Sequence, residues 1–265
     1  MGIRLCSLSS GSSGNCIYIG SDSAGLLIDC GISGKEIFEG LKNIGVCTST
    51  IQGILVTHEH SDHTKGIGIV SRKLNIPIYA NSKTWEGIGD SIGKVKSENI
   101  KLFDTGTDFE INEIGIKTFS IPHDAAEPVG FSFIKGNRKV CIATDLGYFS
   151  EEVKNNIKAS DMVLLEANHD IEMLKVSQYP YFLKRRILSD VGHLSNEAAG
   201  NAVLELMDTG VRKVLLGHLS RENNFPELAY ETVKSILEEN KITVGKDIEL
   251  DVAPRRGISK YYEVE

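Results

Sequence analysis

The amino-acid sequence predicts an α/β protein built as a four-layer αββα sandwich. The first half of the chain is rich in short apolar, β-branched runs, and from Ser150 onward helical and strand-like segments alternate. Each segment has an apolar face. Two sheets packed on each other, each covered by helices on its outer face, bury all of these faces. Because neither a linker nor an internal repeat divides the chain, we expect a single domain over residues 1–265.

The first half is expected to supply most of the strands. Residues 32–46 form the first expected helix, since apolar side chains recur there at helical spacing and Gly45 stands where a helix would stop. A second helix is expected over residues 64–74. The strands, apolar runs bounded by turn residues, are expected at residues 3–8, 16–20, 25–29, 51–57, 76–80, 100–103, 114–121, 129–134 and 140–144.

The second half is expected to alternate between helices and strands. Helical spacing of apolar residues predicts helices at residues 150–159, 170–175, 181–188, 196–207 and 227–239. Apolar runs of strand length lie at residues 162–166, 213–216 and 248–252.

The composition indicates a soluble protein that acts in the cytoplasm. Hydrophobic residues make up 41% and charged residues 25% of the chain, and no apolar run approaches the ~18 residues of a membrane span. The N-terminal sequence lacks the apolar stretch of a secretory signal. The five cysteines are odd in number and include no C-x-x-C pair, so we expect mostly buried free thiols. Protein partners are not indicated.

The net charge of −7 argues against a protein that coats nucleic acid nonspecifically. It leaves open a local basic groove, or a site where bound cations supply the positive field.

A dense cluster of metal-ligand side chains follows the predicted strand at residues 51–57. Within Thr57-His58-Glu59-His60-Ser61-Asp62-His63, alternating positions direct His58 and His60 to one side. Asp62 and His63 turn to another side, so two neighbouring metals could be bound. Imidazole and carboxylate ligands suit zinc, manganese or iron. The cluster therefore predicts a site for two divalent metal ions.

Three more candidate ligands stand at the ends of predicted strands. His123, Asp145 and His218 each follow an apolar run. Side chains held at strand ends by a rigid sheet can meet across one edge. Taken alone, His123 or His218 would be an ordinary structural histidine, but beside the cluster each is predicted to bind metal.

These residues together resemble the five-motif signature of the metallo-β-lactamase superfamily. Asp29, which ends Leu26-Leu27-Ile28-Asp29, matches the first motif of that signature. The resemblance implies the metallo-β-lactamase fold, with one metal bound by His58, His60 and His123, the other by Asp62, His63 and His218, and Asp145 bridging both. It implies that Asp29 does not touch metal but holds the histidine loop by hydrogen bonds. True β-lactamases of the common subgroup carry Cys at the bridging position, so Asp145 argues against β-lactam hydrolysis.

The resemblance extends to nucleases. Gly192-His193-Leu194-Ser195 is similar to the Gly-His-Ser-Thr element of ribonuclease Z-type enzymes, although Leu194 replaces a small polar residue. Strings in both halves of the chain are similar to the bacterial YycJ or WalJ group: residues 8–15, 166–170, 183–187 and 192–196. This implies a 5′→3′ exonuclease that acts on DNA ends through a metal-bridging hydroxide, with Asp62 and His193 as catalytic residues.

Four residues are candidates for binding the substrate. Ser195 precedes a predicted helix and could bind an anion there. Arg185 and Arg186, beside Lys184, would either bind a substrate phosphate in bidentate fashion or form a solvated helix face. His169 could orient a ligand, bind a terminal phosphate or cap a helix.

Two neighbouring segments carry further open alternatives. The nearby Tyr179, Tyr181 and Phe182 would stack on bases or belong to the core. Ser12, Ser13 and Asn15 are turn residues or reach the mouth of the site.

Three other functions compete with the DNA exonuclease. One is a small-molecule phosphodiesterase or thioesterase, which the acidic net charge favours. Another is an RNA-processing nuclease, since the metal centre would serve both nucleic acids. The last is a metal-bound scaffold without turnover. The sequence argues against it, because every ligand position is filled.

Overall fold

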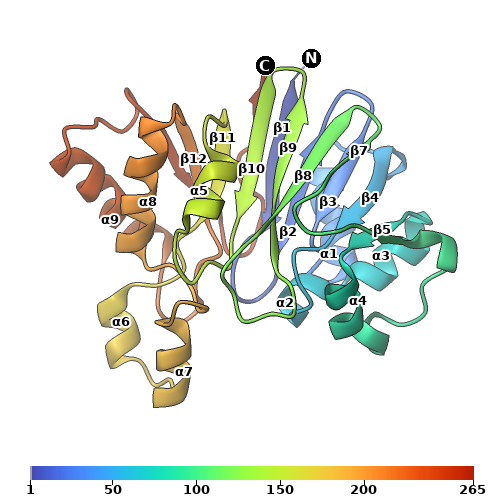
Figure 1. Ribbon diagram of the computed structural model, residues 1–265, viewed down its shortest axis with the longest axis horizontal. Coiled ribbons are helices and arrows are strands. Elements are labelled where there is room, and N and C mark those ends of the chain that lie inside the picture. Colours follow the sequence, from blue (N-terminus) through green and yellow to red (C-terminus); the bar gives the residue numbers. More distant parts are fainter. Residues whose placement is uncertain (1) are drawn as a thin grey trace.

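The computed structural model describes residues 2–265 and confirms the predicted αββα sandwich (Figure 1). Each of the two sheets has seven strands. The first sheet runs in the order β14 (Tyr262–Val264), β1 (Ile3–Ser9), β2 (Cys16–Gly20), β3 (Gly25–Ile28), β4 (Ile51–Leu55), β5 (Ile78–Ala80) and β6 (Ile100–Leu102). The second runs in the order β13 (Glu249–Val252), β12 (Lys213–Gly217), β11 (Met162–Glu166), β10 (Arg138–Ala143), β9 (Val129–Lys135), β8 (Ile114–Ser120) and β7 (Asp108–Ile111).

Helices cover the outer face of each sheet. Those on the first sheet are α1 (Gly34–Asn43), α3 (Ile67–Leu74) and α4 (Ser82–Ile88), and the short α2 (Ser61–Thr64) lies at the end of this sheet (Figure 1). The later helices are α5 (Glu151–Ile157), α6 (Ile171–Val176), α7 (Tyr181–Ile187), α8 (Asn196–Asp208) and α9 (Pro226–Glu239). Of the later helices, α5, α8 and α9 pack on the second sheet, whereas α6 and α7 project from one end of the sandwich (Figure 1). No helix within residues 2–265 is long and apolar enough to cross a membrane.

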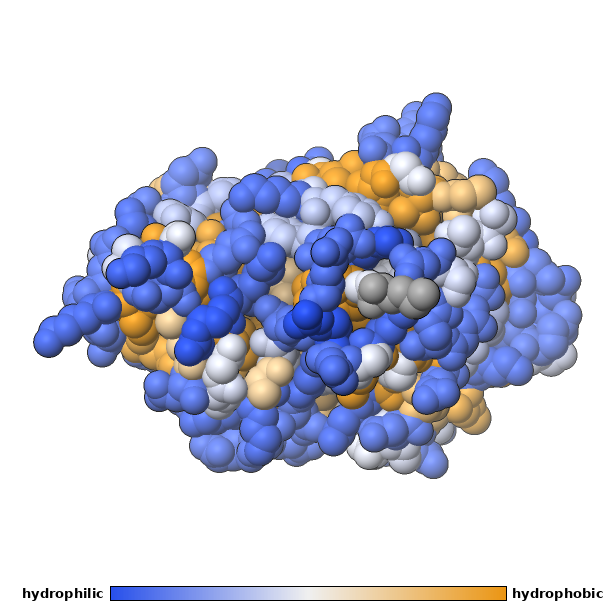
Figure 2. All heavy atoms as spheres, turned by 90° about the horizontal axis from the view of Figure 1, so that it is seen from above, coloured by the Kyte–Doolittle hydropathy of each residue, from blue (hydrophilic) through white to orange (hydrophobic). Residues whose placement is uncertain are grey.

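Strand direction places the site. Strands β3 to β6 are mutually parallel, and so are β10 to β13. The carboxyl ends of parallel strands lie at one edge of a sheet, and the loops that follow them meet there. In this protein those edges adjoin α2 and α7, at the end of the sandwich away from the two termini (Figure 1). The end that carries the termini is covered mainly by hydrophilic side chains, with smaller hydrophobic areas between them (Figure 2).

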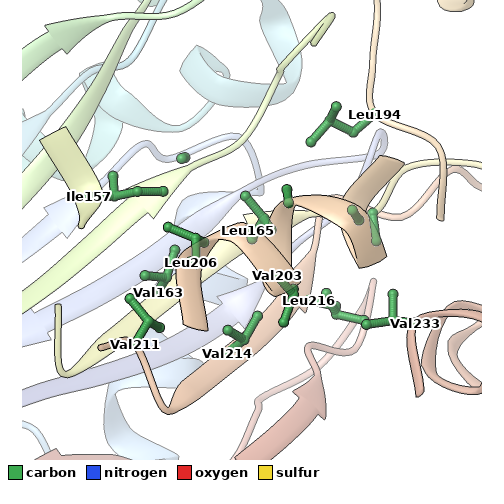
Figure 3. Close-up of a cluster of buried hydrophobic side chains, with 14 of the residues drawn as sticks. Ile157, Val163, Leu165, Leu194, Val203, Leu206, Val211, Val214, Leu216 and Val233 are labelled. Atoms are coloured by element: carbon green, nitrogen blue, oxygen red, sulfur yellow. The ribbon is translucent and has the colours of Figure 1, made fainter. Parts of the chain in front are cut away.

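Side chains alternate between two apolar layers, which fixes the register of the central strands. In β11, Met162 and Leu164 face the other sheet, and Val163 and Leu165 face the helices. Figure 3 shows Leu165 beside Val203 and Leu206 of α8. Because both faces of such a strand are buried, its amino-acid sequence is a continuous apolar run, as is typical of strands in parallel sheets.

The sequence analysis missed two strands and one α-helix of the described residues, besides the short 3-10 turns. Strand β14 is only three residues long, and its partner β1 lies at the other end of the amino-acid sequence. Strand β7 pairs with β8 and has three partly or fully exposed residues out of four. Helix α4 begins at Asn81, whose side chain accepts a hydrogen bond from the Thr84 backbone.

The helix expected over residues 64–74 is divided into α2 and α3 at Gly66. A Cβ at Gly66 would lie 2.4 Å from the Ile32 carbonyl oxygen, so the backbone packs too closely there for another residue. All five cysteines are free; four are buried and Cys47 is exposed.

Candidate active site

The loops after four strands bring all seven predicted ligands together. His58, His60, Asp62 and His63 follow β4, and the other three follow β8, β10 and β12. The donor atoms of these seven residues, with those of Glu166 and His193, form four overlapping groups, and within each group all atoms lie within 4.8 Å of one another. The groups are His58, His60 and His123; His58, His63 and Asp145; Asp62, His63 and His218; and Asp145, Glu166, His193 and His218.

Asp145 lies between the ligand groups. Its Oδ2 is 3.4 Å from His63 Nε2, and its Oδ1 is 3.5 Å from His218 Nε2 and 3.7 Å from His123 Nε2. Burial opposes ionisation of Asp145, but the three histidines outweigh it and hold its pKa below the usual range. The carboxylate is therefore ionised, and its Oδ1 lies within 3.7 Å of a histidine from each of the two predicted ligand groups, His123 and His218.

Outer hydrogen bonds fix the direction of four imidazoles. In each of them Nδ1 is bound by a neighbour and Nε2 is left to face the cluster. The pairs are His58 with Thr57 Oγ1 (2.9 Å), His63 with Asp29 Oδ2 (2.7 Å), His123 with the Gly192 carbonyl (3.1 Å) and His218 with Glu166 Oε1 (2.7 Å). Metal-binding histidines are usually held in this way, because the outer bond fixes both tautomer and ring orientation.

The inward-facing atoms fit divalent cations. His60 Nδ1 lies 3.0 Å from His58 Nε2 and 3.4 Å from His123 Nε2, so three ring nitrogens converge on one point. Within residues 2–265, the buried atoms Asp145 Oδ2 and His218 Nε2 have no hydrogen-bond partner. Such orphaned atoms are rare unless an ion or water satisfies them. Burial lowers the pKa of His58, so this imidazole is neutral, as a ligand must be.

Asp29 supports the histidine loop from behind. Its carboxylate accepts hydrogen bonds from the backbone N–H of Thr57 (2.9 Å), the hydroxyl of Thr57 (2.8 Å) and His63 Nδ1. The residue directly follows β3 and is 1% exposed.

Three strand-end residues adopt the left-handed backbone conformation. Asp29, Asp145 and His218 have φ values of 57°, 62° and 57°. This region is uncommon outside glycine, although Asp and His tolerate it better than most residues. Backbone strain of this kind is concentrated at functional sites, where the surrounding structure maintains it.

Glu166, which the sequence analysis did not select, links the two histidines of the second sheet. Its Oε1 accepts hydrogen bonds from His193 Nδ1 (2.9 Å) and His218 Nδ1 (2.7 Å). Its Oε2 accepts from the backbone N–H groups of Leu146 (2.7 Å) and Leu194 (3.0 Å). Burial favours the neutral acid, but His193 outweighs it and holds the pKa of Glu166 below the usual range. The sequence does contain a signal for this residue: Glu166 is an acidic residue at the end of an apolar strand, as Asp29 is.

His193 lies at the edge of the cluster. Because an ionised carboxylate only accepts hydrogen bonds, Glu166 requires the proton of His193 on Nδ1. The other nitrogen, Nε2, is then free to exchange a proton with a bound molecule. The side chain is 12% exposed, so it is reachable from outside, unlike His218 at 1%.

Ser195 and His169 lie together behind His193. Ser195 is the N-cap of α8, and its hydroxyl accepts a hydrogen bond from the Ala198 backbone (3.1 Å). His169 is 1% exposed, and neither ring nitrogen has a partner within residues 2–265. Burial lowers the pKa of His169 to about 4, so the ring is neutral at physiological pH. A substrate-binding role for either residue stays a prediction.

The three basic residues of α7 have different surroundings. Lys184 Nζ donates to the carbonyls of Lys175 (2.6 Å) and Ser177 (2.8 Å), so it joins α7 to α6 and does not form part of a free cationic strip. Arg186 forms a bidentate ion pair with the carboxylate of Asp124, the residue next to His123. Arg185 is exposed, and its guanidinium lies 5.9 Å from the Tyr181 ring centre.

The aromatic side chains of this helix are not part of the core. Tyr181 is 76% and Phe182 is 73% exposed. The serine-rich turn is divided: Ser12 and Ser13 are exposed, whereas Asn15 is buried with its Nδ2 3.1 Å from His63 Nε2.

The chain is similar to known proteins over nearly its whole length. Residues 25–219 match the Beta-lactamase superfamily domain. The exodeoxyribonuclease YycJ of Bacillus anthracis is 42% identical over 256 residues, which cover 96% of this chain and 97% of that protein. The exodeoxyribonuclease WalJ of Streptococcus pneumoniae is 40% identical over 257 residues, 96% of each chain. The metallo-β-lactamase fold protein YhfI from Bacillus subtilis has the same fold, with a TM-score of 0.73, 14% identity and full coverage of both chains.

Proposed function

Since the chain belongs to the β-lactamase superfamily, we propose that it is a metal-dependent phosphodiesterase that removes nucleotides from DNA ends in the 5′→3′ direction. One observation carries the chemistry: a complete set of seven ligand side chains converges, with Asp145 close to histidines of both predicted groups, His123 and His218. Two relatives that are exodeoxyribonucleases at 40–42% identity support DNA as the substrate. With a substrate of this kind, we infer that the protein acts in the cytoplasm.

We assign two divalent ions to the site, zinc or manganese, with iron as a third candidate. His58, His60 and His123 would hold one ion, Asp62, His63 and His218 the other, and Asp145 would bridge them. When bound, such a pair supplies a water of lowered pKa and positive charge for the phosphate oxygens. Asp145 as an oxygen ligand, in place of a thiolate, agrees with a phosphodiester substrate.

The side chains of this protein have distinct tasks in the hydrolysis. Water adds to the phosphorus, the P–O bond to the leaving group breaks, and the leaving oxygen must take a proton. His193 would hold that proton at Nε2, because Nδ1 donates to Glu166. General acid help of this kind is worth roughly 10²–10⁴-fold. Asp62, with 27% of its side chain exposed, would position the attacking water at the mouth of the site.

The test begins with metal content and continues with activity. Protein purified without chelator should carry about two metal ions per chain by elemental analysis. Chelation should abolish activity, and separate additions of zinc, manganese and iron should identify the ion that restores it. The substrates are 5′-labelled and 3′-labelled DNA, the matching RNA, and bis-nitrophenyl phosphate.

We expect the 5′ label to be released first as a mononucleotide. Release of the 3′ label first would reverse the polarity, and preference for RNA would make the protein an RNA-processing nuclease. Cleavage of the small ester with no attack on either nucleic acid would leave a small-molecule phosphodiesterase. Less than half an ion per chain would contradict the metal centre itself.

A further inference from the structure

Three hollows on the surface join into one path beside the metal cluster. The first, about 580 Å³, is lined by Lys65 and Arg256 at the start of α1. The second, about 640 Å³, is lined by Ser12 and Arg221. The third, about 500 Å³, lies on the α6–α7 hairpin. Ser13 lines both the first and the second hollow, and Tyr179 lines both the second and the third, so adjacent hollows share a wall.

The serine-rich turn fixes this path next to the candidate ligands. The backbone N–H of Asn15 donates to the Asp62 carbonyl (2.8 Å), and the N–H of Ser12 donates to the carbonyl of Leu219, which follows His218 (3.4 Å). The turn therefore lies between the loop that carries Asp62 and the loop that carries His218. A chain that follows the hollows passes over the exposed hydroxyls of Ser12 and Ser13, directly beside the cluster.

The charges along the path favour a polyanion. Within residues 2–265, no carboxylate lies within 4.0 Å of the cationic groups of Lys65, Arg185 or Arg256. Three carboxylates line the hollows, Glu36, Glu39 and Glu222, against six cationic side chains: Lys65, Arg256, Arg221, Lys175, Lys184 and Arg185. The lining therefore has an excess of positive charge.

The two ends of the path differ in a way that suits one strand of nucleic acid. The end at Lys65 and Arg256 offers two cations and the hydroxyls of Ser13 and Ser33, groups that bind phosphates, beside the carboxylates of Glu36 and Glu39. The end at the hairpin offers Tyr181, which is 76% exposed, beside Arg185. An exposed ring can stack on a base only if that base is unpaired, because the faces of paired bases are covered by their neighbours.

We infer that the three hollows form one strand groove, defined by Lys65, Arg256, Ser12, Arg221, Tyr179 and Arg185, which holds the single-stranded part of the DNA substrate beside the metal centre. This inference rests on the proposed function and extends it to the nucleotides that are not being cleaved. It predicts that the enzyme prefers longer single strands to short ones, up to the length that fills the groove.

The experiment compares the metal-loaded parent with the double variant Lys65→Ala, Arg256→Ala, which removes cations at the end of the groove away from the hairpin. The control is Lys94→Ala, Lys101→Ala, which removes the same charge from exposed positions outside the three hollows. Binding is measured across a salt series with phosphorothioate single strands, which resist cleavage. Activity is measured with unmodified single strands of increasing length.

Loss of two phosphate contacts should reduce the slope of log affinity against log salt by about 1.4, at roughly 0.7 per contact, and weaken binding roughly tenfold at low salt. The loss of activity should increase with strand length in the groove variant and be absent in the control. If the parent degrades DNA and the groove variant equals it in slope and at every length, the groove inference is wrong while the exonuclease stands. If the parent attacks no DNA, the proposed function itself fails.

Discussion

Single residues in this protein act mainly through the partners that hold them. Glu166 shows this most clearly, because one buried carboxylate accepts four hydrogen bonds, two from imidazoles and two from backbone N–H groups. All four partners are donors, so only a group with two accepting oxygens satisfies them. This contact set makes Glu166 a positioning residue for His193 and for the ligand His218.

The substitution Glu166→Gln tests that role. Whichever way the new amide turns, its NH₂ group faces two N–H donors, and each donor that loses its acceptor costs roughly 1–3 kcal/mol. We expect the variant to fold with reduced stability and to lose about 10²-fold in turnover, because one amide oxygen cannot accept from both imidazoles and both backbone N–H groups, so either His193 or the backbone next to it at Leu194 loses its partner. Turnover of DNA, urea unfolding and elemental analysis provide the measurements.

A double-mutant cycle distinguishes positioning from general damage. If Glu166 acts through His193, the variant Glu166→Gln, His193→Ala should be little slower than His193→Ala alone, since coupled residues are not additive. Strictly additive losses would show that the two residues act independently. A normal rate for Glu166→Gln would remove Glu166 from the mechanism.

At the scale of helices and strands, the sequence was informative wherever the pattern is local. The apolar runs of β4, β11 and β12 predicted central strands, and residues directly after strands were correctly selected as neighbours in space. The family resemblance drawn from these residues is confirmed by the match over residues 25–219. Strand β14 was out of reach because its partner β1 lies at the opposite end of the sequence.

Long-range contacts also explain what the sequence did not predict about the basic helix. Lys184, Arg185 and Arg186 are consecutive and alike, yet one braces α6, one is free and one pairs with Asp124 across the site. The contacts of these three side chains depend on how α7 packs against segments that are distant in the sequence, and residue spacing does not predict that packing.

The α6–α7 hairpin is the element on which the nucleic-acid proposal makes its sharpest prediction. The variant Tyr181→Ala, Arg185→Ala removes an exposed ring and a free cation without touching the metal ligands. We expect weaker binding of single-stranded DNA, because stacking contributes roughly 1–3 kcal/mol per base, and a salt slope lower by about 0.7. Fluorescence anisotropy with cleavage-resistant strands measures both quantities.

A matched variant supplies the comparison for the hairpin. Val176→Ala removes an 80% exposed apolar side chain from α6, beside the same loop, and should bind DNA like the parent. Equal losses in the two variants would indicate a general disturbance of the hairpin, and unchanged binding in both would show that α7 has no contact with DNA.

For the molecule as a whole, the candidate metal centre joins the two sheets. His58, His60, Asp62 and His63 come from the loop after β4 in the first sheet, whereas His123, Asp145 and His218 follow strands of the second. Bound ions would therefore connect the halves of the sandwich at one end, while the β1–β14 pair closes the first sheet at the chain termini. Metal binding and global stability should be linked.

Thermal unfolding of the chelated and the metal-loaded protein measures this linkage. A ligand that binds only the folded state at 100 times its dissociation constant stabilises by about 2.7 kcal/mol, which raises the Tm of a domain near this size by roughly 5–10 °C. Asp145→Ala should lose most of that increase, because it removes a carboxylate that lies close to both ligand groups, at His123 and His218. Asp208→Ala, at the exposed end of α8, should keep all of it. An equal increase in Asp145→Ala and in the parent would show that this carboxylate does not bridge the ions, and no increase in the parent would show that the sheets are held together without them.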